Sequence, residues 1–292
     1  MEGTDIKMSK VLSVNNIYKS YGNTQVLKNV SFEMEKGDIV GLIGQNGAGK
    51  TTLIDILAGV IAPNSGSVLL CDKWSVNDCE NYYKNLCVAF DQSPFYPHLT
   101  GYKNLRIYSA DEKKINTYLK FFGLEEVKNK KVSTYSLGMK QRLNISRAFL
   151  MWSNLMIMDE PINGLDTRIV IQVKKYIQEK SKEGFSALIS CHALKEMLLF
   201  CNRFIFVHKG QIVVEIDSKS GDFETYDTYG DLDDNSLQEW LATNKVAFLK
   251  IPLLNKVYFK NENNIPHFIK ASKIESGTNI LENLYLQIEN ID

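Results

Sequence analysis

The sequence predicts an α/β protein with a mostly parallel sheet, and two observations lead to that prediction. Short, continuous apolar runs occupy residues 39–43 and 155–158, as expected for strands that are buried on both faces, and residues 187–190 also predict a strand. Segments with apolar residues at helical spacing lie between them, as at residues 115–122 and 169–177. Strands that alternate with helices favour a parallel sheet with right-handed crossovers.

Two further segments predict additions to this sheet. Residues 26–34 alternate between apolar and polar side chains, which is typical of a half-buried strand and predicts an antiparallel β subdomain. Residues from about 94 to 152 have a mainly helical pattern and predict a helical subdomain. In that region Thr100 is a candidate N-cap, and Gly123 is a candidate helix end.

The composition changes near residue 217, where we place a domain boundary. Residues 1–217 form the predicted main domain, whose last strands make a hairpin that turns at Lys209 and Gly210. Residues 218–234 are rich in Asp, Ser, Gly and Tyr, and we expect a linker there. Residues 235–292 predict a small C-terminal α+β extension.

Net charge, cysteine spacing and the lack of long apolar segments bear on which partners and which cellular compartment the sequence predicts. The 292 residues contain 34 Lys plus Arg and 34 Asp plus Glu, so no net charge attracts nucleic acid, and we expect no nucleic-acid partner. The five cysteines form no CxxC pair and predict reduced thiols. The N-terminal segment lacks an apolar core, so we expect no signal peptide. No uninterrupted apolar run is long enough for a transmembrane helix.

A glycine-rich loop after residues 39–43 predicts a phosphate-binding site. The loop fits G-x-x-x-x-G-K-[ST] and opens a predicted helix, which is the context this motif needs; a chance glycine-rich turn is the alternative. Its glycines let backbone N–H groups approach a phosphate, and the helix N-terminus adds positive potential. The predicted nucleotide-binding residues of the loop are Gly44, Asn46, Gly47, Ala48, Gly49, Lys50, Thr51 and Thr52.

Particular roles follow for several side chains. Lys50 is expected to reach the β- and γ-phosphates, and the Thr51 hydroxyl to ligate Mg²⁺. Asp159 and Glu160 follow a buried strand, where an aspartate can hold Mg²⁺, directly or through water, and Glu160 can polarise the attacking water. An Asp-Glu pair by itself is usually only a strand end, but the pairing with the glycine-rich loop favours function.

Residues 135–142 distinguish among the classes of protein that have such a phosphate-binding loop. Residues 135–142, YSLGMKQR, resemble the signature sequence of ABC ATPases and precede Asp159 at the family spacing. The departure is Leu137, where the usual LSGGQ has its first glycine. The resemblance runs from about residue 11 to residue 217. It implies an ATP-binding subunit with Gln92 as the Q-loop glutamine, residues 161–166 as the D-loop, and His192 as the switch histidine.

The resemblance assigns roles that each have a plainer alternative. Tyr21 is expected to stack on adenine, with Tyr18 as a nearby competitor and a surface tyrosine as the alternative. Gln92 is expected to contact Mg²⁺ and water rather than be an ordinary loop residue. His192 is expected to contact the γ-phosphate rather than be a packed strand-end histidine. Asp166 is expected to act across a dimer, to cap a helix, or both.

The resemblance also implies partners. Ser136 and Gly138, at the start of a predicted helix, would meet the γ-phosphate bound to a second subunit, which implies a head-to-tail dimer of this chain or of this chain with a paralogue. A separate transmembrane permease would place the pair at the cytoplasmic face of the membrane. Residues 94–96 are expected to touch that permease. The signature variant resembles exporters of drugs, bacteriocins or other antimicrobial peptides.

Two other classes compete with this interpretation. A non-transport ABC ATPase that acts on DNA or the ribosome is disfavoured, because the segment between Gln92 and Ser136 is too short for a coiled coil and the chain has one cassette. A regulatory module that binds ATP without hydrolysing it is disfavoured, because Glu160 and His192 are both present. The function expected from the sequence is therefore ATP hydrolysis that energises a permease.

Overall fold

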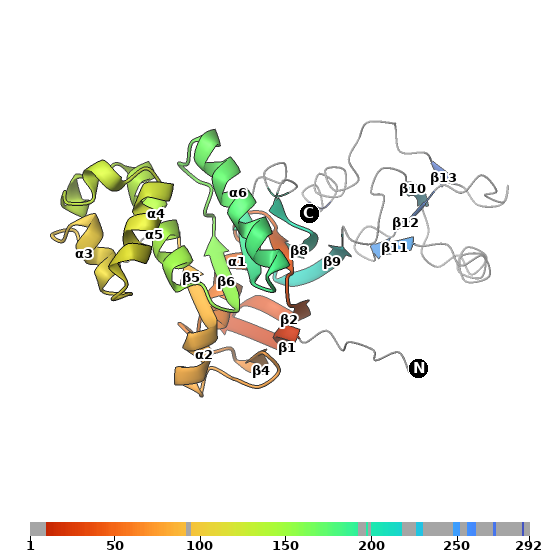
Figure 1. Cartoon of the computed structure of the whole chain (residues 1–292). Helices are drawn as coiled ribbons and strands as arrows, with labels where there is room; N and C mark the ends of the chain where they lie inside the picture. Colours follow the sequence, from red (N-terminus) through yellow and green to blue (C-terminus); the bar gives the residue numbers. More distant parts are fainter. Residues whose placement is uncertain are drawn as a thin grey trace, which may run out of the picture.

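The computed structural model describes residues 10–91, 95–191, 197, 200–217, 226–229, 248–251, 256–260, 271–272 and 288. Its centre is a six-stranded sheet in the order β5-β6-β7-β3-β8-β9 (Figure 1). The strands are β3 (Ile39–Ile43), β5 (Leu86–Ala89), β6 (Leu155–Asp159), β7 (Ser186–Cys191), β8 (Arg203–His208) and β9 (Gln211–Asp217).

The central strands are parallel, as predicted from their apolar runs. Every residue of β3, β6 and β7 is buried, and β3 pairs in parallel with both β7 and β8. β9 runs antiparallel to β8 and closes the predicted hairpin at Lys209 and Gly210. Alternate side chains of the strands enter two apolar clusters on opposite faces.

Each face of the sheet is covered by different elements. One cluster joins Ile43, Met158 and Ile189 to α5 (Leu137–Met151) and α6 (Thr167–Lys182). The other joins Leu42 and Ile157 to α1 (Lys50–Leu57) and to the antiparallel strands. The two-sided cover explains why the parallel strands are continuously apolar.

The predicted antiparallel β subdomain is a sheet in the order β2-β1-β4. It consists of β1 (Lys10–Tyr21), β2 (Thr24–Glu35) and β4 (Ser65–Leu70), and β1 pairs antiparallel with both neighbours. Helix α2 (Cys79–Asn85) follows and leads into β5. Figure 1 shows this sheet below the central one, with α3, α4 and α5 to one side.

The helical region has the caps that the sequence predicts. Helix α3 (Gly101–Arg106) begins after Thr100, whose hydroxyl accepts the Lys103 N–H. Helix α4 (Glu112–Phe121) is followed by Gly123 at φ 63°, a left-handed residue at a helix end. The short turns η1 (Glu125–Val127) and η2 (Val132–Thr134) lead into α5.

An aromatic cluster ties α4 and α5 to α6. The rings of Phe149 and Tyr176 stack with centroids 4.6 Å apart, and Tyr118 packs edge-on against both. The Tyr118 and Tyr176 hydroxyls are hydrogen-bonded at 2.6 Å. The helical region is thereby fastened to a helix that covers the central sheet.

A four-stranded antiparallel sheet lies near the C-terminus, in the order β11-β12-β10-β13. Its strands are β10 (Tyr226–Tyr229), β11 (Phe248–Ile251), β12 (Lys256–Lys260) and β13 (Ala271–Ser272). Because β10 lies inside residues 218–234, the stretch predicted as a linker contributes a strand. Ile288 is buried in the apolar cluster that contains Val214 and Ile216.

Candidate active site

The glycine-rich loop lies between β3 and α1, as predicted, and its backbone is tightly enclosed. A Cβ on Gly44 would lie 2.3 Å from the Val207 carbonyl oxygen, and one on Gly49 would lie 2.8 Å from Leu27 Cδ2. Gly47 and Gly49 have φ angles of 82° and 103°, which favour glycine. The loop is therefore a backbone cradle of the kind that phosphates bind.

Lys50 begins α1 and is 6% exposed. Its Nζ donates to the carbonyl oxygens of Gly44 at 2.6 Å and Gln45 at 3.0 Å. Burial lowers the pKa of this ammonium, and the carboxylates of Glu160 and Asp159 oppose that shift. Thr51 is exposed and Thr52 is half-buried on the first turn of the helix.

Asp159 is the last residue of β6, at the carboxyl edge of the sheet. Its buried carboxylate accepts hydrogen bonds from the hydroxyls of Ser190 and Thr51. Burial raises the pKa of this carboxyl, as do the nearby Glu160 and Asp91 charges, while the two hydrogen bonds lower it. Hydroxyl and carboxylate oxygens in contact are a donor set that fits Mg²⁺.

Glu160 has an unusual backbone. Its φ is 47°, a left-handed value that costs a non-glycine residue roughly 1–2 kcal/mol. Its N–H donates to Ser190 Oγ at 3.0 Å, and its carboxylate accepts from Asn163 Nδ2 at 2.6 Å. Backbone strain held by specific hydrogen bonds is common at sites of chemistry.

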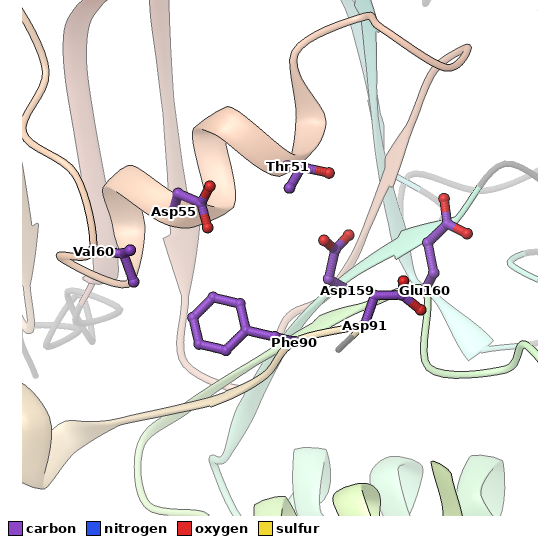
Figure 2. Close-up of a pocket in the computed structure, with 7 residues that line it drawn as sticks. All are labelled: Thr51, Asp55, Val60, Phe90, Asp91, Asp159 and Glu160. Atoms are coloured by element: carbon purple, nitrogen blue, oxygen red, sulfur yellow. The ribbon is translucent and has the colours of Figure 1, made fainter. Parts of the chain in front are cut away.

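Thr51, Asp159 and Glu160 lie on the wall of a pocket of about 590 Å³. Figure 2 shows Thr51 and Asp55 projecting from α1 towards the side that carries Asp159. Sequence reasoning missed Asp55 and Asp91; for Asp55 the available signal is its position one helical turn after Thr51. Burial raises the pKa of Asp55, and the Asp159 charge adds to this effect. The pocket is lined by Thr51, Asp55, Val60, Phe90, Asp91, Asp159 and Glu160.

The predicted signature segment begins α5 and packs against the predicted D-loop. Ser136 caps the helix by accepting the Met139 N–H at 3.2 Å. A Cβ on Gly138 would lie 2.7 Å from the Gly164 carbonyl oxygen, so only glycine allows this approach. Leu137 is 78% exposed. Asp166 caps α6 by accepting the Ile169 N–H at 3.1 Å, which confirms its predicted capping role.

Comparison with known proteins identifies the family. A model of the ABC transporter family matches residues 27–163. The ABC transporter ATP-binding protein YdbJ of Bacillus subtilis is 37% identical over 74% of this chain and 72% of its own length. The lantibiotic transport ATP-binding protein SrtF of Streptococcus pyogenes is 33% identical over 70% of this chain and 90% of its own length.

The chain belongs to the ATP-binding proteins of ABC transporters. A solved ATP-binding subunit of an ABC transporter has a TM-score of 0.67 and 28% identity, and the match covers 72% of this chain and 91% of that one. The family hydrolyses ATP to power transport, and this chain is such a subunit. The α/β fold expected from the sequence is thereby confirmed.

Two features of this ABC cassette bear on Tyr21, the expected adenine contact. Tyr21 ends β1, is 50% exposed, and has Lys19 Nζ 5.3 Å from its ring centroid. Its hairpin reaches the phosphate loop, because a Cβ on Gly49 would lie 3.2 Å from the Val26 carbonyl oxygen. The competitor Tyr18 is half-buried and pairs with Ser65 of β4. The exposed ring of Tyr21 agrees with the expected adenine contact, which stays a prediction.

Several predicted residues lie outside the part of the chain that the structure describes. They are Gln92 and His192, together with Pro94 of the expected permease contact. In the same loop Tyr96 is 52% exposed, whereas Phe95 is half-buried and packs against the core. Tyr96 is therefore the more accessible of the two aromatics, whereas Phe95 packs against the apolar cluster. The contact with a permease stays a prediction.

Two findings concern membrane-spanning helices and disulfides. Within the described ranges, every helix is too short or too polar to cross a membrane. All five cysteines lie in the described residues, and the structure pairs none of them in a disulfide.

Proposed function

We propose that this subunit binds MgATP at the phosphate loop and at the adjoining pocket, which is lined by α1 and by the residues at the ends of β5 and β6, and hydrolyses it there. The observation that carries the proposal is the convergence of Lys50, Thr51, Asp159 and Glu160. Thr51 and Asp159 would hold Mg²⁺, which supplies charge neutralisation at the phosphates. Glu160 would orient the attacking water, with Gln92 and His192 completing the set.

We propose further that the working ATPase is a head-to-tail dimer with two ATP molecules at the interface. Ser136 and Gly138 lie at the N-terminus of the 15-residue helix α5, where the dipole favours an anion. The Ser136 oxygen already accepts the Met139 N–H, which leaves its proton available for a phosphate. Gly138 lies against the carbonyl oxygen of Gly164, two residues before Asp166, which is consistent with a role for Asp166 at the same interface. Both a homodimer and a mixed dimer satisfy this arrangement.

The proposed membrane partner is a permease on a separate chain, which would hold the subunit at the cytoplasmic face of the membrane. Tyr96 supports a docking role, because its side chain is exposed while its backbone is hydrogen-bonded to Asn104. The Tyr96 N–H donates to Asn104 Oδ1 at 2.9 Å, and Asn104 Nδ2 donates to the Tyr96 carbonyl at 3.1 Å. Asn104 is fully buried, so the backbone of the exposed Tyr96 is held by a residue of the interior.

The proposed cargo is an antimicrobial peptide or a drug, moved outwards. Similarity to a lantibiotic transport protein and the YSLGM form of the signature support this cargo class. The proposal predicts that cells carrying the subunit and its permease resist such a peptide. Resistance should be lost with Lys50→Ala.

The test is co-purification from detergent-solubilised native membranes, with ATPase activity measured in the recovered complex. The expected result is a polytopic membrane protein whose complex loses activity with Lys50→Ala. Recovery of ribosomes or DNA instead would overturn the transport role. Replacement of both Phe95 and Tyr96 by Ala should weaken permease recovery, whereas Ile171→Ala, an exposed apolar residue of α6, should not.

A further inference from the structure

Ser190 lies where the two acidic residues of the site meet the neighbouring strand. It is the next-to-last residue of β7, is fully buried, and is paired in parallel register with Asp159 of β6. Two residues later the chain reaches His192. Ser190 therefore lies on β7, the strand that precedes the predicted switch histidine, and it is paired with the last residue of β6.

The Ser190 hydroxyl uses both of its hydrogen-bonding capacities at the site. It donates its proton to Asp159 Oδ1 and accepts the Glu160 N–H at 3.0 Å. A hydroxyl has one proton, and a carboxylate can only accept, so the direction of each bond is fixed. One atom thereby restrains the side chain of Asp159 and the backbone of Glu160.

The hydrogen bond to Ser190 restrains the backbone of Glu160, the residue with the left-handed φ angle. Glu160 has φ 47°, and this left-handed turn directs the chain away from β6 just where the side chain must face the pocket. The bond from its N–H to Ser190 Oγ crosses to the next strand, outside the regular ladder. Without it the Glu160 N–H would lose this partner.

We propose that Ser190 is a positioning residue for ATP hydrolysis, which holds the Asp159 carboxylate in place for Mg²⁺ and fixes the turn that aims Glu160 at the attacking water. The proposal rests on the assignment of Asp159 and Glu160 given above. Hydrogen bonds to a metal-ligating carboxylate orient it, and their removal typically costs about 10–100-fold in metal affinity or activity.

The plainer alternative is that Ser190 only satisfies buried polar groups. The same strand supplies a matched control for this alternative in Ser186, which is also fully buried. Its hydroxyl accepts the Gly37 N–H at 3.0 Å and donates to the Glu35 carbonyl at 3.2 Å, at the other end of β7. A purely structural role predicts similar effects from Ser190→Ala and Ser186→Ala.

The experiment compares Ser190→Ala, Ser190→Thr and Ser186→Ala in the full chain. It measures Mn²⁺ binding by EPR with a non-hydrolysable ATP analogue, ATPase kcat and KM, and thermal unfolding. Ser190→Ala should weaken Mn²⁺ binding and lower kcat, each by about 10–100-fold. Ser190→Thr should restore both, and Ser186→Ala should change only thermal stability.

Unchanged Mn²⁺ binding and kcat in Ser190→Ala, or equal losses in Ser186→Ala, would overturn the role of Ser190. If Ser190→Ala does not fold, Ser190→Cys serves instead, since its thiol is a weak donor and must show the same direction of loss. Lys50→Ala and Glu160→Gln are measured alongside. If they too retain hydrolysis, the site assignment has failed rather than the role of Ser190 alone.

Discussion

The side-chain nitrogen of Lys50 donates a hydrogen bond to the carbonyl oxygen of Gly44 at 2.6 Å, so the lysine is folded onto the loop that precedes it. Gly44 in turn lies too close to the Val207 carbonyl oxygen to carry a side chain. The loop, the lysine and the end of β8 therefore form one tightly packed unit. This unit places a cation beside the acidic pair on β6.

Lys50→Ala removes that cation and its contacts with the phosphates. We expect ATPase activity to fall by at least about 10²-fold, which is typical when one donor to the developing charge is lost. Steady-state phosphate release checks this expectation. Lys103→Ala, at an exposed position on α3, should retain activity; equal activity in both variants would contradict the role of Lys50.

The Tyr118–Tyr176 hydrogen bond should contribute to stability across the junction of α4 and α6. Tyr118→Phe and Tyr176→Phe should each lower the free energy of unfolding, with a coupling of about 0.5–1.5 kcal/mol in a double-mutant cycle. Urea unfolding measures these energies. A cycle of Tyr118→Phe with Tyr21→Phe, at a distant exposed ring, should be additive. Additivity between Tyr118 and Tyr176 would show that their bond is not stabilising.

Asp55 should destabilise the fold at neutral pH. Because burial and Asp159 raise the pKa of Asp55, the folded state binds its proton more tightly than the unfolded state does. The stability of the protein therefore falls as the pH rises from the ordinary pKa of an aspartate through the raised pKa of Asp55. Asp55→Asn should gain up to about 1 kcal/mol at pH 7.

The pH dependence of that gain is the diagnostic part of the prediction. The difference between Asp55→Asn and the parent chain should shrink as the pH is lowered towards 4, because the parent carboxyl becomes protonated. Unfolding free energies at a series of pH values measure it. Glu126→Gln, at an exposed carboxylate, should not reproduce this trend; a gain that grows on acidification would contradict the explanation.

Much of the fold follows from local sequence patterns. The continuous apolar runs of β3, β6 and β7 predict buried parallel strands, and the caps at Thr100 and Asp166 follow from residue type. The C-terminal sheet is harder, because β10 carries the Asp- and Tyr-rich composition that also suits a linker. Its pairing with β12 and β13 depends on contacts distant in sequence.

At the site, too, some residues follow from local sequence patterns and others depend on contacts distant in sequence. The loop around Lys50 and the pair Asp159 and Glu160 have sequence patterns that can be recognised without a structure. Ser190 has no such pattern, since its role depends on the parallel register between β6 and β7. Asp55 and Asp91 likewise enter the pocket only when α1 and the end of β5 are brought together. The residues that sequence reasoning missed are therefore those whose place at the site depends on contacts between elements distant in sequence.

The most direct test of the central claim is the hydrolysis of ATP by Glu160→Gln compared with the parent chain. Binding of MgATP should be retained, because the phosphate loop and Asp159 are unchanged, while the hydrolysis rate should fall by about 10²–10⁴-fold. In the presence of ATP the variant should accumulate as a dimer, whereas Glu183→Gln, at the C-cap that follows α6, should match the parent. Undiminished turnover in Glu160→Gln would contradict the account of this site.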